Sequence, residues 1–338
     1  MKALAPAASL WDVARGRASL VGARFAAGLR PGLVSPVEAR LNMGIAYDDL
    51  ADEERRYLAG RTWRSDLGVV ARAALSRLYA STPKAIAPRR PFVVSAEVDN
   101  LTLGEALDRL FATPPRDRAL VSHFVHPHAL NLAVENDELR GALRRADLVL
   151  PDGAGIRLGG RVIGFSLRQN LNGTDMLPAL CARAAREGVP LVLIGAAPDV
   201  AEACAARLRE QTPGLEIPVV RHGFLSEAES AAVAAEVGAL GRALVLVAMG
   251  SPHQERWTWK HLAAVGGASV VTVGGLFDFY SGRVPRAPLA WRELGLEWVF
   301  RFLQEPRRLA RRYLLGNPLF MLRAMRQRLL GVPAKIAS

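Results

Sequence analysis

Short apolar runs alternate with helix-like segments between residues 92 and 282. Runs at residues 119–125, 147–150, 189–194, 217–221, 243–249 and 268–273 predict strands. Apolar positions recur with helical spacing at residues 174–187, 199–210 and 226–239, and a helix is expected to reach residue 139 after the first strand. Strands that alternate with helices in this way are typical of an α/β domain. We therefore predict a Rossmann-like, mostly parallel sheet flanked by helices.

The two ends of the chain follow a different pattern. Residues 1–90 lack strand signals and predict short helices, of which residues 10–25 and 66–79 are amphipathic and basic. A proline-rich stretch at residues 83–91 is typical of a linker. Residues 294–315 and 317–330 predict helices that mix arginine with aromatic residues. The chain thus divides into a helical N-terminal extension (residues 1–90), an α/β core (91–282) and a basic, helical C-terminal appendage (283–338).

Charge is concentrated in the extension and the appendage. The extension carries 15 Lys and Arg against 8 Asp and Glu, and the appendage 12 against 3, whereas the core carries 17 against 21. Basic ends suit anionic lipid, nucleic acid or phosphorylated substrates. Nucleic acid is the weakest of these partners, because no zinc-finger spacing or aromatic RNA-binding signature accompanies the charge. For the appendage, the pattern favours equally a membrane interface and a terminal helix packed on the core.

Composition and motifs disfavour several other classes. Two cysteines, Cys181 and Cys204, support neither a disulfide scaffold nor a zinc site. No apolar run reaches the about 18 residues that a spanning helix needs. The first residues lack the apolar core of a signal peptide, so export is not expected. A P-loop is absent, and GAG at residues 153–155 lacks the third glycine of a dinucleotide fingerprint.

Asp152 is the candidate catalytic carboxylate. It follows a predicted strand, in PDG at residues 151–153. Ligands of parallel sheets bind outside the carboxyl ends of the strands, where a general base would act. The alternative is an aspartate whose carboxylate accepts hydrogen bonds from its own turn. His123, His126 and His128 resemble a metal cluster, with the last two expected on one strand face, but no carboxylate completes a zinc-hydrolase pattern and no metal is assigned.

Motifs in the core and the appendage together resemble one family. They are PDG at residues 151–153, GTD at 173–175, LIG at 193–195, HGF at 222–224, GSPHQE at 250–255, GGLFD at 274–278, RAP at 286–288, EWVFR at 297–301 and EPRR at 305–308. In this order they resemble the WecG/TagA/CpsF glycosyltransferases, glycosyltransferase family 26, which includes GumM-type exopolysaccharide enzymes. The resemblance covers roughly residues 93–325.

The resemblance implies an inverting, metal-independent hexosyltransferase that needs no cofactor. Its donor would be a UDP-sugar and its acceptor a polyprenyl-diphosphate-linked saccharide, in exopolysaccharide or cell-surface polysaccharide biosynthesis. The protein would lie peripherally on an anionic membrane surface, at the cytoplasmic face of the inner membrane. A homo-oligomer or a complex with other polysaccharide-assembly proteins is compatible with this role.

The resemblance also suggests site residues. Asp152 matches the proposed catalytic base, and Arg301, Arg308 and Arg311 match arginines that close over the active site. Gly223, Phe224 and Gln254 match positions that line the UDP site. Further substrate-binding candidates are the strand-end and motif residues Gly195, Gly250, Glu255, Gly275 and Asp278.

Two departures from the family pattern bear on the substrate. Where the teichoic-acid branch has Thr-x-Asn, this chain has Phe124 and His126, so UDP-glucose is the preferred donor and UDP-N-acetylmannosamine the alternative. We expect His126 to act in the sugar or acceptor step. Asn170 occupies the place of an arginine before GTD, and Arg168 is its candidate substitute. A non-catalytic subunit that binds lipid-linked sugar is a rival reading, against which the intact Asp152 and Gln254 argue.

The extension is foreign to this family. AYD at residues 46–48, Tyr57, Trp63 and SDL at residues 65–67 faintly resemble the C-terminal tail of polyprenyl-phosphate sugar phosphotransferases. The catalytic part of those enzymes is missing. The resemblance therefore implies at most a segment that docks on a membrane or a partner.

Overall fold

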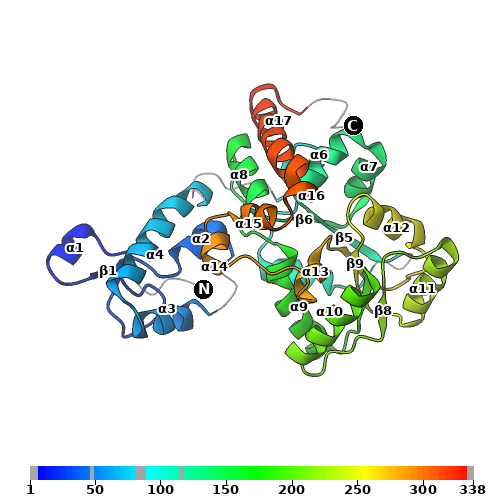
Figure 1. Cartoon of the computed structure of the whole chain (residues 1–338), viewed down its shortest axis with the longest axis horizontal. Helices are drawn as coiled ribbons and strands as arrows, with labels where there is room; N and C mark the ends of the chain where they lie inside the picture. The colour runs from blue at the N-terminus through cyan, green and yellow to red at the C-terminus, as the bar shows by residue number, and fades with distance from the viewer. Residues whose placement is uncertain (1–6, 46–48, 81–88, 115–117, 333–338) are drawn as a thin grey trace.

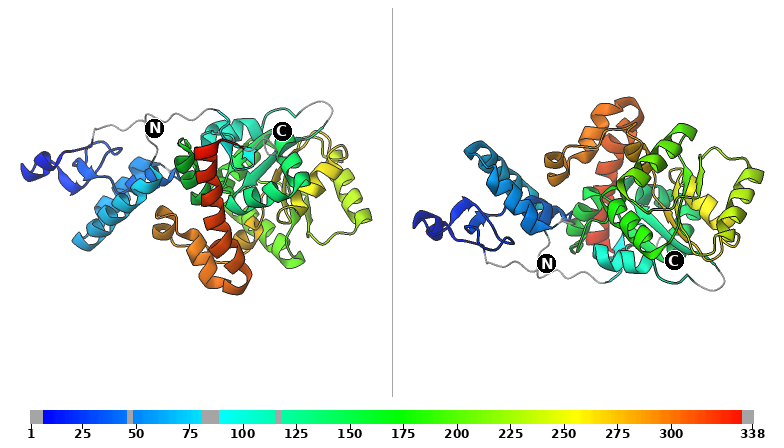
Figure 2. Two further views of the ribbon diagram at one scale, coloured as in Figure 1. Left: turned by 90° about the horizontal axis from the view of Figure 1, so that it is seen from above. Right: turned by 90° about the horizontal axis from the view of Figure 1, so that it is seen from below.

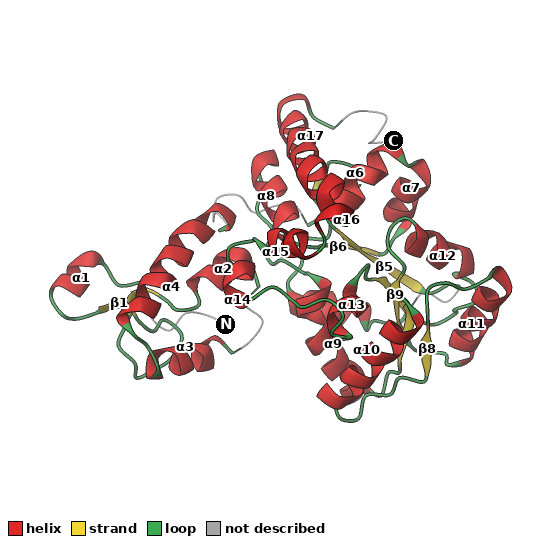
Figure 3. Ribbon diagram, in the orientation of Figure 1, coloured by secondary structure: helices red, strands yellow, loops and turns green. Residues whose placement is uncertain are grey.

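The computed structural model describes residues 7–45, 49–80, 89–114 and 118–332. The AYD sequence at residues 46–48 and most of the predicted linker lie outside the described residues. Figure 1 shows an α/β body with the extension on one side, and Figure 3 shows that helices surround the strands of this body. The domain boundaries at residues 90 and 282 stay predictions.

Six parallel strands form the central sheet, in the order β6-β5-β10-β9-β7-β8. Their bounds are β5 (Leu120–Val125), β6 (Leu148–Pro151), β7 (Leu191–Gly195), β8 (Val219–Arg221), β9 (Leu244–Ala248) and β10 (Ser269–Thr272). Most strand residues are buried leucine and valine, as expected for a parallel sheet that helices cover on both faces. The predicted α/β fold and its six strands are confirmed.

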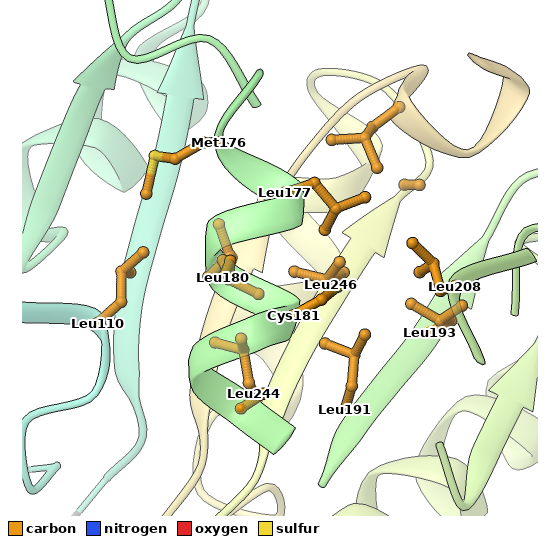
Figure 4. Close-up of a cluster of buried hydrophobic side chains, with 14 of the residues drawn as sticks. Leu110, Met176, Leu177, Leu180, Cys181, Leu191, Leu193, Leu208, Leu244 and Leu246 are labelled. Carbon is orange, nitrogen blue, oxygen red and sulfur yellow. The ribbon is translucent and has the colours of Figure 1, made fainter. Parts of the chain in front are cut away.

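Helices pack on both faces of the sheet. They are α5 (Leu103–Leu110), α6 (Pro127–Glu135), α7 (Asp137–Arg145), α8 (Ala154–Ile163), α9 (Gly173–Glu187), α10 (Pro198–Gln211), α11 (Glu227–Ala239), α12 (His253–His261) and α13 (Leu276–Tyr280). Figure 4 shows leucines of α9 meeting leucines of β7 and β9, with the free thiol of Cys181 buried among them. The single helix expected to reach residue 139 is wrong, because Asn136 begins a second helix by accepting from the Leu139 N–H at 2.9 Å.

The strand order reverses between β5 and β10. From β5 the chain moves to its neighbour β6 on one side, and then crosses to β7 on the other side of β10 and β9. Ligands of open parallel sheets bind outside the carboxyl ends of the strands where the order reverses in this way. His126, which follows β5, and Gly274, which follows β10, flank that position.

The extension contains strands that the sequence did not predict. It comprises α1 (Leu10–Ala14), β1 (Ser19–Val21), β2 (Gly32–Val34), α2 (Glu38–Met43), α3 (Leu50–Ala59), α4 (Trp63–Ser76) and a 3₁₀ turn, η1 (Arg77–Tyr79). The helix predicted at residues 66–79 is confirmed as α4 and η1. The helix predicted at residues 10–25 is wrong beyond α1, because Gly16 turns the chain with φ +72° and β1 then pairs with β2. A two-residue hairpin, β3 (Phe92–Val93) and β4 (Ala96–Glu97), leads into the core.

The appendage is a series of short helices followed by a long one. It comprises α14 (Leu289–Glu293), α15 (Glu297–Gln304), α16 (Pro306–Ala310), a π-helical turn, η2 (Arg311–Leu315), and α17 (Gly316–Leu330). The predicted single helix over residues 294–315 is wrong, because Pro306 cannot continue α15 and instead starts α16. α17 packs against α6 and α8 and buries Phe320. No described helix combines the length and the apolar composition that a membrane span requires.

Candidate active site

Asp152 lies directly after β6, half-buried at the carboxyl edge of the sheet. Its N–H donates to the Val125 carbonyl at 2.7 Å, which ties the turn to β5. The following N–H, of Gly153, donates to Asn170 Oδ1 at 2.8 Å. Across the described part of the chain, no backbone N–H donates to the Asp152 carboxylate. The structure therefore does not show the alternative in which Asp152 serves only its own turn.

The surroundings of Asp152 favour its protonated form. The pKa of Asp152 is raised to about 7, first by burial and then by the negative charge of Glu297. The positive charges of Arg312 and Arg301 act in the opposite direction and lower it. A carboxyl group that titrates near neutral pH can take up a proton during a reaction and release it afterwards. Asp152 thus has the electrostatic character of a general base.

The three histidines do not share one strand. His123 lies on β5, buried, with Nδ1 2.9 Å from Thr272 Oγ1. His126 instead precedes α6 as its N-cap, and His128 lies in the first turn of α6, with the two rings stacked at 6.0 Å. Within the described ranges, no group of three His, Cys, Asp or Glu side chains could hold a metal ion. The expectation that His126 and His128 occupy one strand face is wrong, because the chain turns into α6 at Pro127.

His126 meets an arginine of the appendage. Its Nδ1 accepts from the Ala129 N–H at 3.1 Å, and its Nε2 lies 3.0 Å from an Arg312 nitrogen. Burial lowers the pKa of His126 well below its usual value, and Arg312 lowers it further. A neutral imidazole accepts at only one nitrogen, so His126 accepts either the Ala129 N–H at Nδ1 or an Arg312 N–H at Nε2. In both cases His126 holds the end of β5 next to Arg312.

The sequence did not single out Arg312. Of the predicted appendage arginines, Arg308 is exposed and pairs with Glu305, and Arg311 is exposed with no ion-pair partner in the part of the chain described. Arg312 is the neighbour that reaches His126 and the field of Asp152. Both arginines belong to the π-helical turn η2, where side chains no longer follow the 3.6-residue period. The sequence shows that Arg311 and Arg312 are adjacent, but it does not show which of the two faces the core.

Arg301 lies on α15 beside the loop that follows β10. Its guanidinium stacks 4.7 Å from the centre of the Phe279 ring. A Cβ atom at Gly275 would lie 3.8 Å from an Arg301 nitrogen and 3.4 Å from Asp278 Oδ2. Burial raises the pKa of Asp278, and the positive charges of Arg283, Arg308 and Arg301 oppose that rise. Three of the predicted site residues, Gly275, Asp278 and Arg301, therefore meet at one place.

Further arginines join the appendage to the core. Arg286 and Arg292 both form ion pairs with Asp175 at the start of α9, and Arg286 Nε lies 3.5 Å from Glu297 Oε1. The Nε atoms of Arg286, Arg292 and Arg301 are buried without a hydrogen-bond acceptor among the described residues. Ion pairs therefore tie the appendage to the start of α9.

Gln254 and Glu255 connect two loops at the carboxyl edge. Gln254 Oε1 accepts from the Gly250 N–H at 3.2 Å and from the Gly274 N–H at 3.0 Å, so it joins the ends of β9 and β10. Gln254 Nε2 donates to Glu255 Oε1 at 2.9 Å, and Ser251 Oγ donates to the same oxygen at 2.7 Å. Burial raises the pKa of Glu255. Both side chains are buried and shape the loop; their contact with substrate stays a prediction.

The remaining nucleotide-site candidates follow β7 and β8. Gly195 ends β7 with φ +141° where its Cβ would meet the Ala248 carbonyl, so only glycine fits. The Gly223 N–H donates to the Ala196 carbonyl at 2.8 Å, which holds the two strand ends together. Phe224 is 77% exposed and could stack on a bound base. These residues sit along the same edge as Asp152, on the far side of β10 and β9.

Two departures from the family pattern have structural roles. Phe124 is buried in the apolar core with Leu276, and one edge of its ring faces Gly173. Arg168 donates to Glu105 at 2.6 Å and is exposed. The backbone hydrogen bond from Thr102, and then the bond from Arg168, lower the pKa of Glu105 to about 2. A substrate role for Arg168 has no support in these contacts.

Residues 92–332 match the sequence model of the glycosyl transferase WecG/TagA/CpsF family. The chain belongs to this family. WecG/TagA/CpsF proteins are glycosyltransferases of cell-surface polysaccharide synthesis, which use a nucleotide-sugar donor and a lipid-linked acceptor. The match covers the core and nearly all of the appendage, so the Asp152 turn and the appendage arginines are parts of one WecG/TagA/CpsF domain, whereas residues 1–91 lie outside it.

Proposed function

We propose that this enzyme transfers a sugar from a UDP-sugar to a polyprenyl-diphosphate-linked saccharide, with inversion and without a metal ion. UDP-glucose is the preferred donor, and UDP-N-acetylmannosamine is the alternative. The enzyme works as a peripheral protein at the cytoplasmic face of the inner membrane. The observation that carries the proposal is the half-buried Asp152, whose pKa burial raises to about 7, opposite the arginines of the appendage.

Asp152 acts as the base in a single displacement. Its carboxylate takes the proton from the attacking acceptor hydroxyl, whose oxygen forms a bond to the anomeric carbon of the donor. The bond from that carbon to the diphosphate oxygen breaks, and UDP leaves with the electron pair. One displacement at this carbon inverts its configuration.

Arginine supplies the positive charge that stabilises the leaving diphosphate. Arg312 lies 3.0 Å from His126 Nε2 and close enough to lower the pKa of Asp152. The unpaired Nε atom of Arg301 adds a second guanidinium donor near Gly275. Donors that are already oriented where charge develops lower the barrier because they need no reorganisation during the reaction.

The proposal is tested with the full chain, a panel of UDP-sugars and lipid-linked acceptors in membrane extract. We expect UDP release to require both substrates, and Asp152→Asn to lower turnover by ~10²–10⁴, the range for loss of a general base. Asp199→Asn, at an exposed carboxylate in the first turn of α10, is the matched control. Wild-type turnover in a folded Asp152→Asn variant would remove Asp152 from the mechanism, and release of UDP by no donor in the panel would contradict the transfer itself.

A further inference from the structure

The turn that carries Asp152 is connected to the extension by two consecutive hydrogen bonds. The Gly153 N–H donates to Asn170 Oδ1 at 2.8 Å. The N–H of the same Asn170 donates to the Gly44 carbonyl at 3.0 Å. Asn170 is buried, so water does not compete for either bond. Asn170 alone thus links Gly153, the residue after Asp152, to Gly44 at the end of α2.

The helix that follows Asp152 is held by the extension as well. Arg157 on α8 is 2% exposed, which makes it one of the most deeply buried large side chains of the molecule. Its guanidinium donates to the carbonyls of Asn42 at 3.1 Å, Tyr79 at 2.7 Å and Leu167 at 2.9 Å. Carbonyls at the end of a helix lack partners within it and carry partial negative charge, so α2 offers Arg157 a matching surface.

Gly44 allows these contacts to form. It ends α2 with φ +70°, and a Cβ atom there would lie 2.7 Å from an Arg157 nitrogen and 2.9 Å from the Asn170 nitrogen. Both distances are shorter than any side chain tolerates. The junction between the extension and the Asp152 turn therefore has no spare room, and a single methyl group at this position would separate its parts.

We propose that the extension is a positioning element for Asp152, acting through Gly44, Asn170 and Arg157. This inference rests on the proposed role of Asp152 as the base. Gly44 touches no reacting group; it fixes where the Asp152 turn stands relative to the appendage arginines. The contacts come from residues 42, 44 and 79, outside the family match at residues 92–332. Displacing a catalytic group by about 1 Å can cost a factor of ~10² in rate, so such support matters for turnover.

Gly44→Ala in the full chain is the direct test. Gly28→Ala is the matched control, because Gly28 has a similar φ of +78° in the same extension but nothing within 4 Å of a Cβ atom. We expect Gly44→Ala to lower kcat by ~10–10² per UDP-binding site, with the KM for the UDP-sugar within about twofold, since the nucleotide contacts are untouched. Gly28→Ala should keep the wild-type kcat. Counting sites by UDP titration removes the effect of any unfolded fraction.

Amide hydrogen exchange at residues 152–156 gives a second readout that does not depend on activity. We expect faster exchange there in Gly44→Ala and in Asn170→Ala, which removes the acceptor of the Gly153 N–H, but not in Gly28→Ala. If Gly44→Ala fails to fold, Asn170→Ala carries the test. Wild-type kcat and exchange in either folded variant overturn the inference. Altered exchange in a protein that transfers no sugar even as wild type would instead contradict the proposed function and leave the junction intact.

Discussion

The extension and the appendage are both basic, yet they meet the core in opposite ways. The extension offers carbonyls to arginines of the core: Arg157 donates to Asn42 and Tyr79, and Arg161 donates to Arg77 and Ala80. The appendage offers guanidinium groups to acidic or neutral partners of the core, namely Asp175 and His126.

Ion pairs neutralise only part of the charge at either end. In the extension, Arg24 pairs with Glu38 and Arg56 with Glu53, whereas Arg15, Arg17 and Arg64 have no carboxylate partner among the described residues. In the appendage, Arg301, Arg307, Arg311 and Arg326 have no carboxylate partner in the described part of the chain. What distinguishes the appendage is that Arg312 and Arg301 lower the pKa of Asp152, and on this ground we propose that it forms a positively charged wall of the active site. Glu293 on α14 joins the two ends, because it pairs with both Arg40 and Arg72 of the extension.

The largest effect is expected at a buried carboxylate of the extension. Glu54 is fully buried and accepts from the N–H groups of Arg24, Phe25 and Ala26 and from Ser35 Oγ. Glu54→Ala leaves these donors without an acceptor, so we expect the free energy of unfolding to fall by about 3–5 kcal/mol. Urea unfolding measures this loss. An unchanged urea midpoint would show that Glu54 does not stabilise the extension, and would contradict the view of the extension as a structural scaffold.

The next effect concerns the appendage and catalysis. Arg312→Ala should lower kcat by ~10²–10³, the cost of removing one donor that stabilises developing negative charge. Arg311→Ala, next to it but exposed, is the matched control and should keep turnover within about threefold. Steady-state kinetics on the two variants decide the point. A greater loss in Arg311→Ala would contradict the role given to Arg312 and favour Arg311, the arginine that the family resemblance suggests.

The third effect is the pH dependence that the appendage imposes on Asp152. Activity needs the carboxylate form, so kcat/KM should rise with pH through about 7, the value to which burial raises the pKa of Asp152. The positive charge of Arg312 lowers this pKa. Arg312→Lys keeps the charge and should leave the rise of kcat/KM at the same pH, whereas Arg312→Ala should move the rise to higher pH. A rise that stays unmoved in Arg312→Ala would show that the appendage charge does not reach Asp152.

Asp152 should also limit stability at neutral pH. Its folded-state pKa lies above that of an unfolded aspartate, so the folded protein binds the proton more tightly and loses stability as pH rises from about 4 to 7. Asp152→Asn removes this loss. We expect the variant to be more stable than wild type at pH 8, by up to about 4 kcal/mol, and equally stable near pH 3, where both are uncharged. Thermal unfolding at the two pH values checks the sign.

The sequence predicted the core better than either end. Continuous apolar runs of the kind at residues 119–125 and 243–249 can only be buried strands or buried helices, and their length and glycine ends favour strands. The position of Asp152 could be predicted in the same way, because a residue that directly follows such a strand lies at the carboxyl edge of the sheet, where ligands bind. The pair β1 and β2 was missed because three-residue strands leave no period in the sequence. The contact between Gly44 and Asn170 joins positions 126 residues apart, and no local pattern reports such a contact.

The smallest effect concerns the membrane. In both views of Figure 2, α4 of the extension and helices of the appendage project from the same side of the body, so either could approach a bilayer. Exposed Leu319, Leu322 and Met325 line α17, where Arg326 has no carboxylate partner within the described residues. Arg323 does not belong to this surface, because it binds Asn131 and Glu135. We therefore expect the unpaired appendage arginines, rather than all basic residues, to hold the enzyme on anionic lipid.

Replacing Arg307 and Arg326 together with glutamine tests this expectation. Each basic residue near an anionic bilayer contributes about 1 kcal/mol, so partition into vesicles of phosphatidylcholine and phosphatidylglycerol should weaken by roughly five-fold per residue. The matched control replaces Arg55 and Arg56, which pair with Asp52 and Glu53 in the extension and so add little net charge. Cosedimentation measures both, with phosphatidylcholine vesicles as the uncharged reference. An equal loss of vesicle binding in the two double variants would show that the extension also contacts the membrane. The extension and the appendage would then differ only in their contacts near Asp152.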